Sequence, residues 1–165
     1  MDRLILFRHG RAEAESDSGD DFDRRLAPCG QAESESTGRR LAEMGHSPDL
    51  ALVSPAARTR ETWAAMQQHF PDARADFDND LYAADSEAVR EAARQAAGPA
   101  ATVMVVGHNP GMQELAVRLL IEAKAPPDLI AKARRGFPTA AAAVFRMEGA
   151  TASVFEALVF PEPQP

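Results

Sequence analysis

The fold of this chain is decided by its residues 1–10, Met-Asp-Arg-Leu-Ile-Leu-Phe-Arg-His-Gly. The uninterrupted apolar run from Leu4 to Phe7 predicts a strand that is buried on both faces. The run ends abruptly in Arg8, His9 and Gly10. Because ligands of open α/β sheets bind at the carboxyl ends of strands, this tripeptide predicts an anion site containing a nucleophile. The tripeptide alone is equally compatible with an inert, solvated strand end.

A second stretch repeats this arrangement near residue 105. The strongly β-like run 102–106 is followed by Gly107-His108-Asn109-Pro110. Asn109-Pro110 is typical of a cap followed by a first-turn proline, which predicts a helix from about 111 to 122. If both strands belong to one sheet, His9 and His108 are expected to lie side by side at the same edge.

Strands and helices are expected to alternate along the rest of the chain. Further strands are predicted at 49–53, 73–77, 140–147 and 152–160. Further helices are predicted at 31–44, from Ser54-Pro55 to before Pro71, from Asp85 or Ser86 to before Gly98, and within 124–137. Ser54 is expected to cap its helix, and the polar segment 11–25 is expected to be a loop.

This alternation predicts an α/β fold with a mostly parallel central sheet and helices on both faces. We expect a single three-layer α/β/α domain over residues 1–160. The last five residues, 161–165, include three prolines and are expected to be frayed.

Composition restricts the classes of partner. The chain has 25 Asp and Glu against 18 Lys and Arg among its 165 residues, for a net charge of −7. Nucleic acid and membranes are therefore not expected as partners, and no segment resembles a signal peptide or a membrane span. Cys29 is the only cysteine, so a reducing, cytoplasmic location is expected. These features do not specify an oligomeric state.

Three segments place cations or imidazoles at strand ends or in the first turn of the following helix. They are Arg8-His9-Gly10, Ser54-Pro55-Ala56-Ala57-Arg58 and Gly107-His108-Asn109-Pro110. Helix N-termini favour anions, and arginine forks match the geometry of phosphate oxygens. A neutral histidine can attack phosphorus near pH 7. The three segments together predict a phosphoryl-transfer site.

These segments resemble the motifs of the histidine phosphatase superfamily, also called the phosphoglycerate mutase-like or RHG family. Within it, the chain resembles the short bacterial phosphohistidine phosphatases of the SixA type. The resemblance runs from residue 3 to about residue 148 and includes two weaker features, Asp23-Arg24-Arg25-Leu26 with Gly30, and Gly136-Phe137-Pro138-Thr139-Ala140. It implies a phosphoglycerate mutase-like fold.

The resemblance also implies roles for individual residues. His9 would be the nucleophile and become transiently phosphorylated. Arg8, Arg58 and His108 would hold the phosphoryl oxygens and stabilise the charge of the transition state. Gly10 and Asn109 would add to substrate binding. No metal ion or other cofactor is implied.

The implied activity is removal of phosphate from phosphohistidine on a protein. Two alternatives remain, a hydrolase of small phosphate monoesters and a phosphate-binding regulatory module without turnover. Longer relatives often carry a general acid in an insertion after Leu81-Tyr82, whereas this chain continues there into a helix. A chain without this insertion is better suited to phosphohistidine, because imidazole leaves more readily than an alkoxide.

The loop between residues 11 and 25 offers substitutes for the missing acid. Its candidates are Asp17, Asp20, Asp21 and Asp23. Asp23 is favoured as the candidate general acid because it lies in one of the weaker family features. Each of these residues is also explained as a solvated loop carboxylate.

Overall fold

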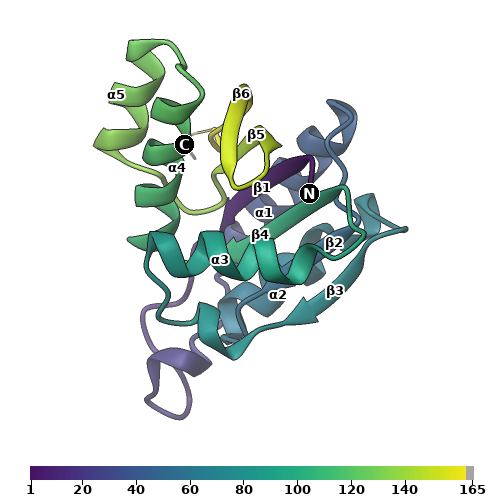
Figure 1. The fold of residues 1–165 in the computed structure, drawn as a ribbon. Coiled ribbons are helices and arrows are strands. Elements are labelled where there is room, and N and C mark those ends of the chain that lie inside the picture. The colour runs from purple at the N-terminus through teal and green to yellow at the C-terminus, as the bar shows by residue number, and fades with distance from the viewer. Residues whose placement is uncertain (163–165) are drawn as a thin grey trace.

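The structure is a computed structural model that describes residues 1–162, with a six-stranded sheet at its centre (Figure 1). The strands are β1 (Arg3–Arg8), β2 (Leu50–Val53), β3 (Arg74–Phe77), β4 (Thr102–Gly107), β5 (Ala142–Glu148) and β6 (Thr151–Val159). The helices are α1 (Pro28–Glu43), α2 (Ala57–Met66), α3 (Ser86–Ala97), α4 (Gly111–Glu122) and α5 (Pro127–Arg135). Three short 3-10 turns are η1 (Asp21–Asp23), η2 (Gln67–His69) and η3 (Asn79–Leu81).

The sheet has the strand order β3-β2-β4-β1-β5-β6. β2 pairs in parallel with β3 and β4, and β1 pairs in parallel with β4. β5 runs antiparallel to β1, and β6 runs antiparallel to β5. The prediction of an α/β fold with a mostly parallel sheet is therefore confirmed.

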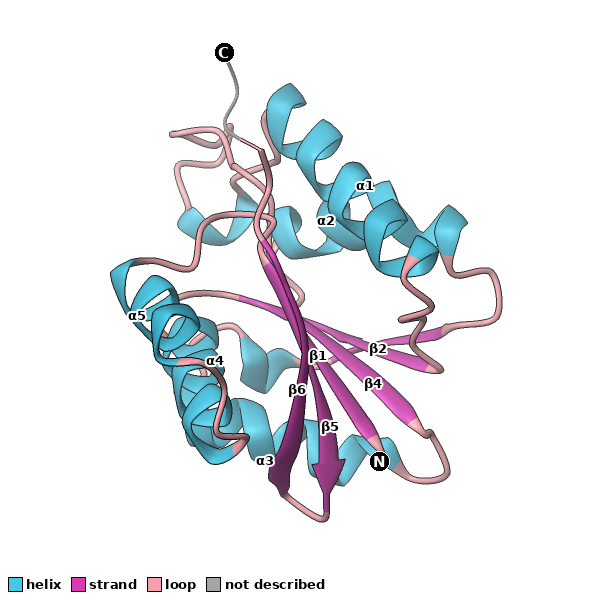
Figure 2. Cartoon of the chain, turned by 90° about the horizontal axis from the view of Figure 1, so that it is seen from above, coloured by secondary structure: helices cyan, strands magenta, loops and turns pink. Residues whose placement is uncertain are grey.

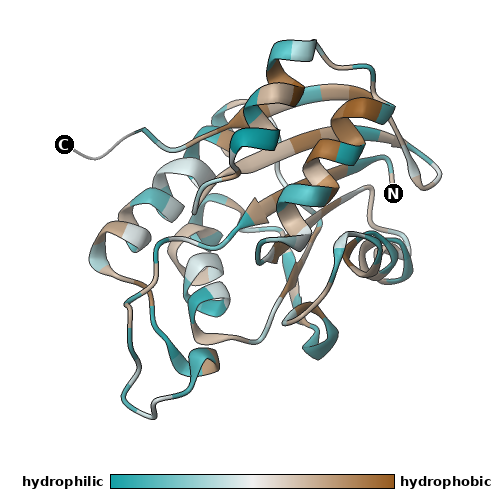
Figure 3. Cartoon of the chain, turned by 90° about the vertical axis from the view of Figure 1, so that its left-hand side faces the viewer, coloured by the Kyte–Doolittle hydropathy of each residue, from teal (hydrophilic) through white to brown (hydrophobic). Residues whose placement is uncertain are grey.

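Helices cover both faces of the sheet (Figure 2). Leu4 and Leu6 of β1 pack in a core with residues of α3 and α4, whereas Ile5 and Phe7 pack in a second core with α1 and α2. All four of these β1 side chains are fully buried, and burying each contributes about 1.5–3 kcal/mol. Figure 3 shows hydrophobic colour on the strands and on parts of the helices that cover them. The apolar run at the start of the chain thus joins the two outer layers to the sheet.

The register of the central strands brings two distant segments together. Arg8 lies opposite Gly107 in the parallel pair of β1 and β4, so the residue after each strand is a histidine. The amide of His9 donates a hydrogen bond to the carbonyl of Gly107 over 3.1 Å. The expectation that His9 and His108 lie at the same edge of the sheet is confirmed.

The prediction that Ser54 caps a helix is wrong. α2 begins at Ala57 with Ala56 in the cap position and no side-chain cap. The amide of Ser54 instead donates to the carbonyl of Val106 over 3.1 Å, which extends the pairing of β2 with β4 by one residue. This pairing keeps the buried hydroxyl of Ser54 at the sheet edge, beside His108 and away from the free amides of the helix.

Other element boundaries differ by small amounts from the predicted ones. α1 begins at Pro28 instead of residue 31, since proline is tolerated in a first turn. β5 begins at Ala142 instead of residue 140, because Ala140 has a positive φ of 60°. The side chain of Asp85 caps α3, as one of the two predicted alternatives requires.

The C-terminal part of the chain is described only to residue 162. Residues 160–162 follow β6 without regular structure, and the rest of the predicted tail, 163–165, lies outside the described residues. Within residues 1–162, no helix combines the length and the apolar character needed to cross a membrane.

Candidate active site

His9 lies directly after β1, and within residues 1–162 its Nε2 atom forms no hydrogen bond. Its side chain is 8% exposed, and Nδ1 lies 2.7 Å from the carbonyl oxygen of Gly10. Because a carbonyl only accepts hydrogen bonds, Nδ1 carries the proton and Nε2 keeps its lone pair. Burial lowers the pKa of His9 to about 3, with the hydrogen bond to Gly10 opposing the shift and the positive charge of nearby Arg58 adding to it. The His9 imidazole is therefore neutral, and nucleophilic through Nε2, at neutral pH.

The backbone that carries His9 is fixed by a close fit. A Cβ atom at Gly10 would overlap the carbonyl oxygen of Gly30 and the hydroxyl of Ser34. The amide of Gly10 donates to the hydroxyl of Thr62 over 2.9 Å. Gly10 is thus required by space, and Thr62 holds the peptide group between His9 and Gly10.

His108 faces His9 from the end of β4, with 5.3 Å between the ring centroids. Its Nε2 lies 2.7 Å from the hydroxyl oxygen of Ser54. Burial, together with the positive charge of Arg58, lowers the pKa of His108 to about 4. Nδ1 of His108 is buried and has no hydrogen-bond partner among residues 1–162.

Arg8 is the last residue of β1 and directly precedes His9. Its Nη1 atom donates to the backbone carbonyl oxygen of Phe137 over 3.0 Å. The side-chain amide of Asn109 donates to the same oxygen over 2.9 Å. Burial and the charge of Arg58 lower the pKa of Arg8. The Nε atom of Arg8 is buried and, within the described part of the chain, has no partner. Asn109, predicted to bind substrate, here supports the carbonyl that positions Arg8.

Arg58 lies in the first turn of α2 and is 7% exposed. It donates to the backbone carbonyl of Asp21 over 2.9 Å and to the carboxylate of Asp21 over 3.0 Å. The hydroxyl of Tyr82 donates to the same carboxylate oxygen. The bonds from Tyr82, Arg24 and Arg58 hold the pKa of Asp21 well below its usual range, so Asp21 is an anion bound to Arg58.

The structure brings Arg8, His9, Arg58 and His108 to one edge of the sheet, and it places Asp23 elsewhere. The carboxylate of Asp23 accepts a hydrogen bond from the hydroxyl of Ser18 over 2.6 Å, in an exposed part of the loop. Asp21, two residues earlier, is the loop carboxylate that contacts the site. The general-acid role of Asp23 and the catalytic roles of the four other residues stay predictions.

Three further residues lie at this site, Ser54, Thr62 and Tyr82, and the sequence predicts no catalytic or binding role for them. The ring of Tyr82 stands perpendicular to that of His108, with 5.6 Å between the centroids, and Phe22 packs against its other edge. The sequence predicts Ser54 only as a helix cap, and it assigns no role to Thr62. No periodic pattern of apolar residues indicates Tyr82, because it follows the short turn η3 and does not lie in a long helix or strand.

No group of three or more His, Cys, Asp and Glu side chains within residues 1–162 is arranged to hold a metal ion.

Comparison with known proteins identifies the class to which this fold and site belong. The sequence model described as "Histidine phosphatase superfamily (branch 1)" matches residues 4–85, which include His9 and Arg58. An uncharacterised protein of Mycobacterium tuberculosis is 33% identical over 147 residues, which are 89% of this chain and 90% of that protein. The chain belongs to the histidine phosphatase superfamily and has its phosphoglycerate mutase-like fold.

Within this superfamily, the chain is similar to the SixA group. A crystal structure of a provisionally assigned phosphohistidine phosphatase SixA from Agrobacterium tumefaciens matches with a TM-score of 0.79 and 33% identity. The match covers 94% of this chain and 97% of that chain. An uncharacterised chloroplast protein of Arabidopsis thaliana is 33% identical over 127 residues, which are 71% of this chain. The chain spans 58% of the length of that plant protein.

Proposed function

We propose that this protein is a phosphatase that forms a phosphohistidine on His9 and removes phosphate from a phosphohistidine of another protein. One observation carries the proposal. The neutral Nε2 of His9 lies among Arg8, Arg58 and His108, two of which have a buried nitrogen without a hydrogen-bond partner in residues 1–162. A buried unpaired donor costs about 1–3 kcal/mol, and a phosphoryl oxygen would supply the missing acceptor.

The geometry supports a two-step transfer. The lone pair of His9 Nε2 forms a bond to phosphorus while the bond from phosphorus to the substrate nitrogen breaks. The electron pair leaves with the substrate imidazole, which takes up a proton from solvent. Water then attacks the phosphorylated His9, releases inorganic phosphate and restores the neutral imidazole. Arg8, Arg58 and His108 stabilise the charge on the transferring group in both steps.

The charge state of the loop favours an imidazole leaving group. An alkoxide leaves poorly unless a general acid protonates it, whereas imidazole has a conjugate acid with a pKa of about 6.5. Asp21 is the carboxyl group in contact with the site, and its lowered pKa means that it carries no proton to give. This favours phosphohistidine over the alternative of small alkyl phosphates. The single Cys29 fits a reducing location, and we place the activity in the cytoplasm.

The test compares three classes of substrate on the same protein. We expect the highest kcat/KM for a phosphohistidine protein, a lower value for p-nitrophenyl phosphate and the lowest for an alkyl phosphate such as phosphoglycerate. Comparable or faster hydrolysis of the alkyl phosphate would contradict the proposed substrate. Binding of phosphate without turnover of any substrate would instead identify a regulatory module.

A further inference from the structure

A pocket of about 390 Å³ adjoins the candidate active site and shares Arg8 with it. It lies between α4, α5 and the end of β6, and we call it the α5 pocket. Its lining includes Arg8, Gln113, Lys132, Arg135, Phe137 and Phe160. Its volume is within the range of about 300–1,000 Å³ that is typical of small-ligand sites.

The charge of this pocket differs from the charge of the whole molecule. The chain carries a net charge of −7, yet the charged side chains that line the α5 pocket are all cations, Arg8, Lys132 and Arg135. Within residues 1–162, neither Lys132 nor Arg135 forms an ion pair. Basic residues in the last turn of α5 also complement the helix dipole, but that interaction does not require them to line the same pocket as Arg8.

The floor of the pocket is apolar, because two phenylalanine rings pack together there. The ammonium group of Lys132 lies 4.6 Å from the ring centroid of Phe160, in a cation–π contact. The rings of Phe160 and Phe137 pack edge to face at 6.0 Å. Phe137 is 1% exposed and its carbonyl binds Arg8. A ligand with a short aliphatic stem and an anionic end would match this combination of an apolar floor and a cationic rim.

We propose that the α5 pocket binds a carboxylate side chain, Asp or Glu, of the protein substrate next to its phosphohistidine. The proposal rests on the proposed function, because it assigns the pocket to the same substrate. Lys132 and Arg135 are exposed, so a side chain on the surface of a folded partner can reach them. Arg8 then contacts the phosphoryl group on one side and neighbours the bound carboxylate on the other.

The experiment uses two phosphohistidine peptides that differ only by Glu or Gln beside the phosphorylated residue. We expect the wild-type protein to prefer the Glu peptide by about three- to tenfold in kcat/KM, as suits two exposed ion pairs. This preference should shrink as salt is added, because such pairs are screened. In the double variant Lys132→Gln, Arg135→Gln the ratio of the two kcat/KM values should fall close to one.

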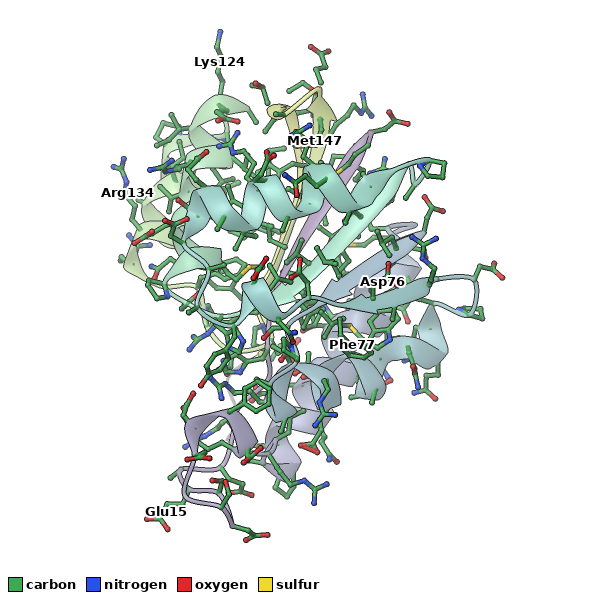
Figure 4. All side chains as sticks on the ribbon, turned by 60° about the horizontal axis from the view of Figure 1, so that its bottom comes forward. Glu15, Asp76, Phe77, Lys124, Arg134 and Met147 are labelled. Atoms are coloured by element: carbon green, nitrogen blue, oxygen red, sulfur yellow. The ribbon has the colours of Figure 1, made fainter. Side chains whose placement is uncertain are left out.

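Arg134→Gln is the matched control. Arg134 lies in the same turn of α5 and is equally exposed, but it does not line the pocket. Figure 4 shows its side chain extending away from the molecule. The control should keep the full preference for the Glu peptide, while losing the same kind of charge from the same helix end.

A second pair of substrates separates this proposal from the proposed function. Phenyl phosphate and carboxyphenyl phosphate also differ by one carboxylate but need no phosphohistidine activity. Equal rates within both pairs in the wild type, or a preference that survives in the double variant, would overturn the α5 pocket as an anion subsite. Failure to hydrolyse the peptides would overturn the proposed function. If the carboxyphenyl ester were then preferred in the wild type alone, the pocket would belong to a small carboxylate, and its assignment to a protein side chain would be wrong.

Discussion

The candidate site has two halves that are built in different ways. His9 and His108 follow paired strands, and the hydrogen bond from His9 to Gly107 ties their backbones together. Asp21, in contrast, reaches the site from a loop that extends below the sheet in Figure 1 and is mostly hydrophilic in Figure 3. The sheet half holds the two histidines to which the proposed function assigns phosphoryl transfer, and the loop half places an anion on Arg58 of α2. Under the proposed function, bonds to phosphorus are made where the backbone is fixed by strand pairing, and phosphate enters where an ion pair must be exchanged.

The largest effect is expected in the sheet half, from His9→Ala. This change removes the nucleophile and should abolish both turnover and the phosphorylated enzyme. The fold should persist, since the residue follows β1 and contributes little to either core. Rapid-quench labelling with a phosphohistidine protein measures the intermediate, and thermal unfolding checks the fold. Labelled phosphate on the variant protein would show that a residue other than His9 is the nucleophile.

The next effect concerns the residue where the two halves meet, Arg58. Arg58→Lys keeps a positive charge but loses the planar pair of donors, so it should not restore activity. The loss of one strong contact in the transition state corresponds to about 100- to 1,000-fold in kcat. Steady-state kinetics with p-nitrophenyl phosphate measures this loss. Rates close to those of the wild type would show that Arg58 does not contact the phosphoryl group in the transition state.

A third prediction concerns the pH dependence of the free energy of unfolding, which the two halves of the site affect in different pH ranges. The pKa of His9 is lowered to about 3 and that of His108 to about 4, whereas histidine in an unfolded chain has a pKa of about 6.5. Below pH 6.5 the unfolded state therefore binds more protons, and stability should fall with pH by up to about 1.4 kcal/mol per pH unit for each histidine. The Asp21 carboxyl, with its lowered pKa, should lose its contribution only below about pH 4, the usual range of aspartate.

Urea unfolding at pH 7, 6 and 5 measures this slope. His9→Gln serves as the comparison, because the difference between the two proteins isolates His9 from the other histidines. The variant should lose less stability than the wild type between pH 7 and pH 5. Identical slopes would mean that His9 is not kept neutral by burial.

The smallest effect is expected in the loop half, from a matched pair of variants. Asp21→Asn weakens the bond to Arg58 and should lower the inhibition constant of inorganic phosphate by about two- to fivefold. Asp23→Asn, two residues away and bound to Ser18, should change it by less than that. Competition against p-nitrophenyl phosphate measures both constants. A larger effect of Asp23→Asn, or a loss of alkyl phosphate hydrolysis in it, would restore Asp23 as the acid.

The same division explains what could be predicted from the sequence. The apolar run Leu4–Phe7 forms a strand whose burial on both faces follows from its composition alone, and parallel pairing then brings His9 beside His108. Ser54 was misassigned because its pairing with Val106 is a tertiary contact, and the local Ser-Pro pattern does not report it. The sequence favours Asp23 among the four loop aspartates, whereas Asp21 contacts Arg58, because the turn η1 decides which carboxylate meets the arginine.

The bond between Arg58 and Asp21 has a consequence for the end of each reaction cycle. A phosphate that takes both donors of Arg58 must first displace an internal carboxylate, so part of its binding energy is offset. When the reaction has ended, the same carboxylate competes with inorganic phosphate for the arginine. An anion tethered a few ångströms away acts at a high effective concentration. If Arg58 binds phosphate as proposed, Asp21 works as a competitor within the protein, which weakens capture of the substrate and speeds departure of the product.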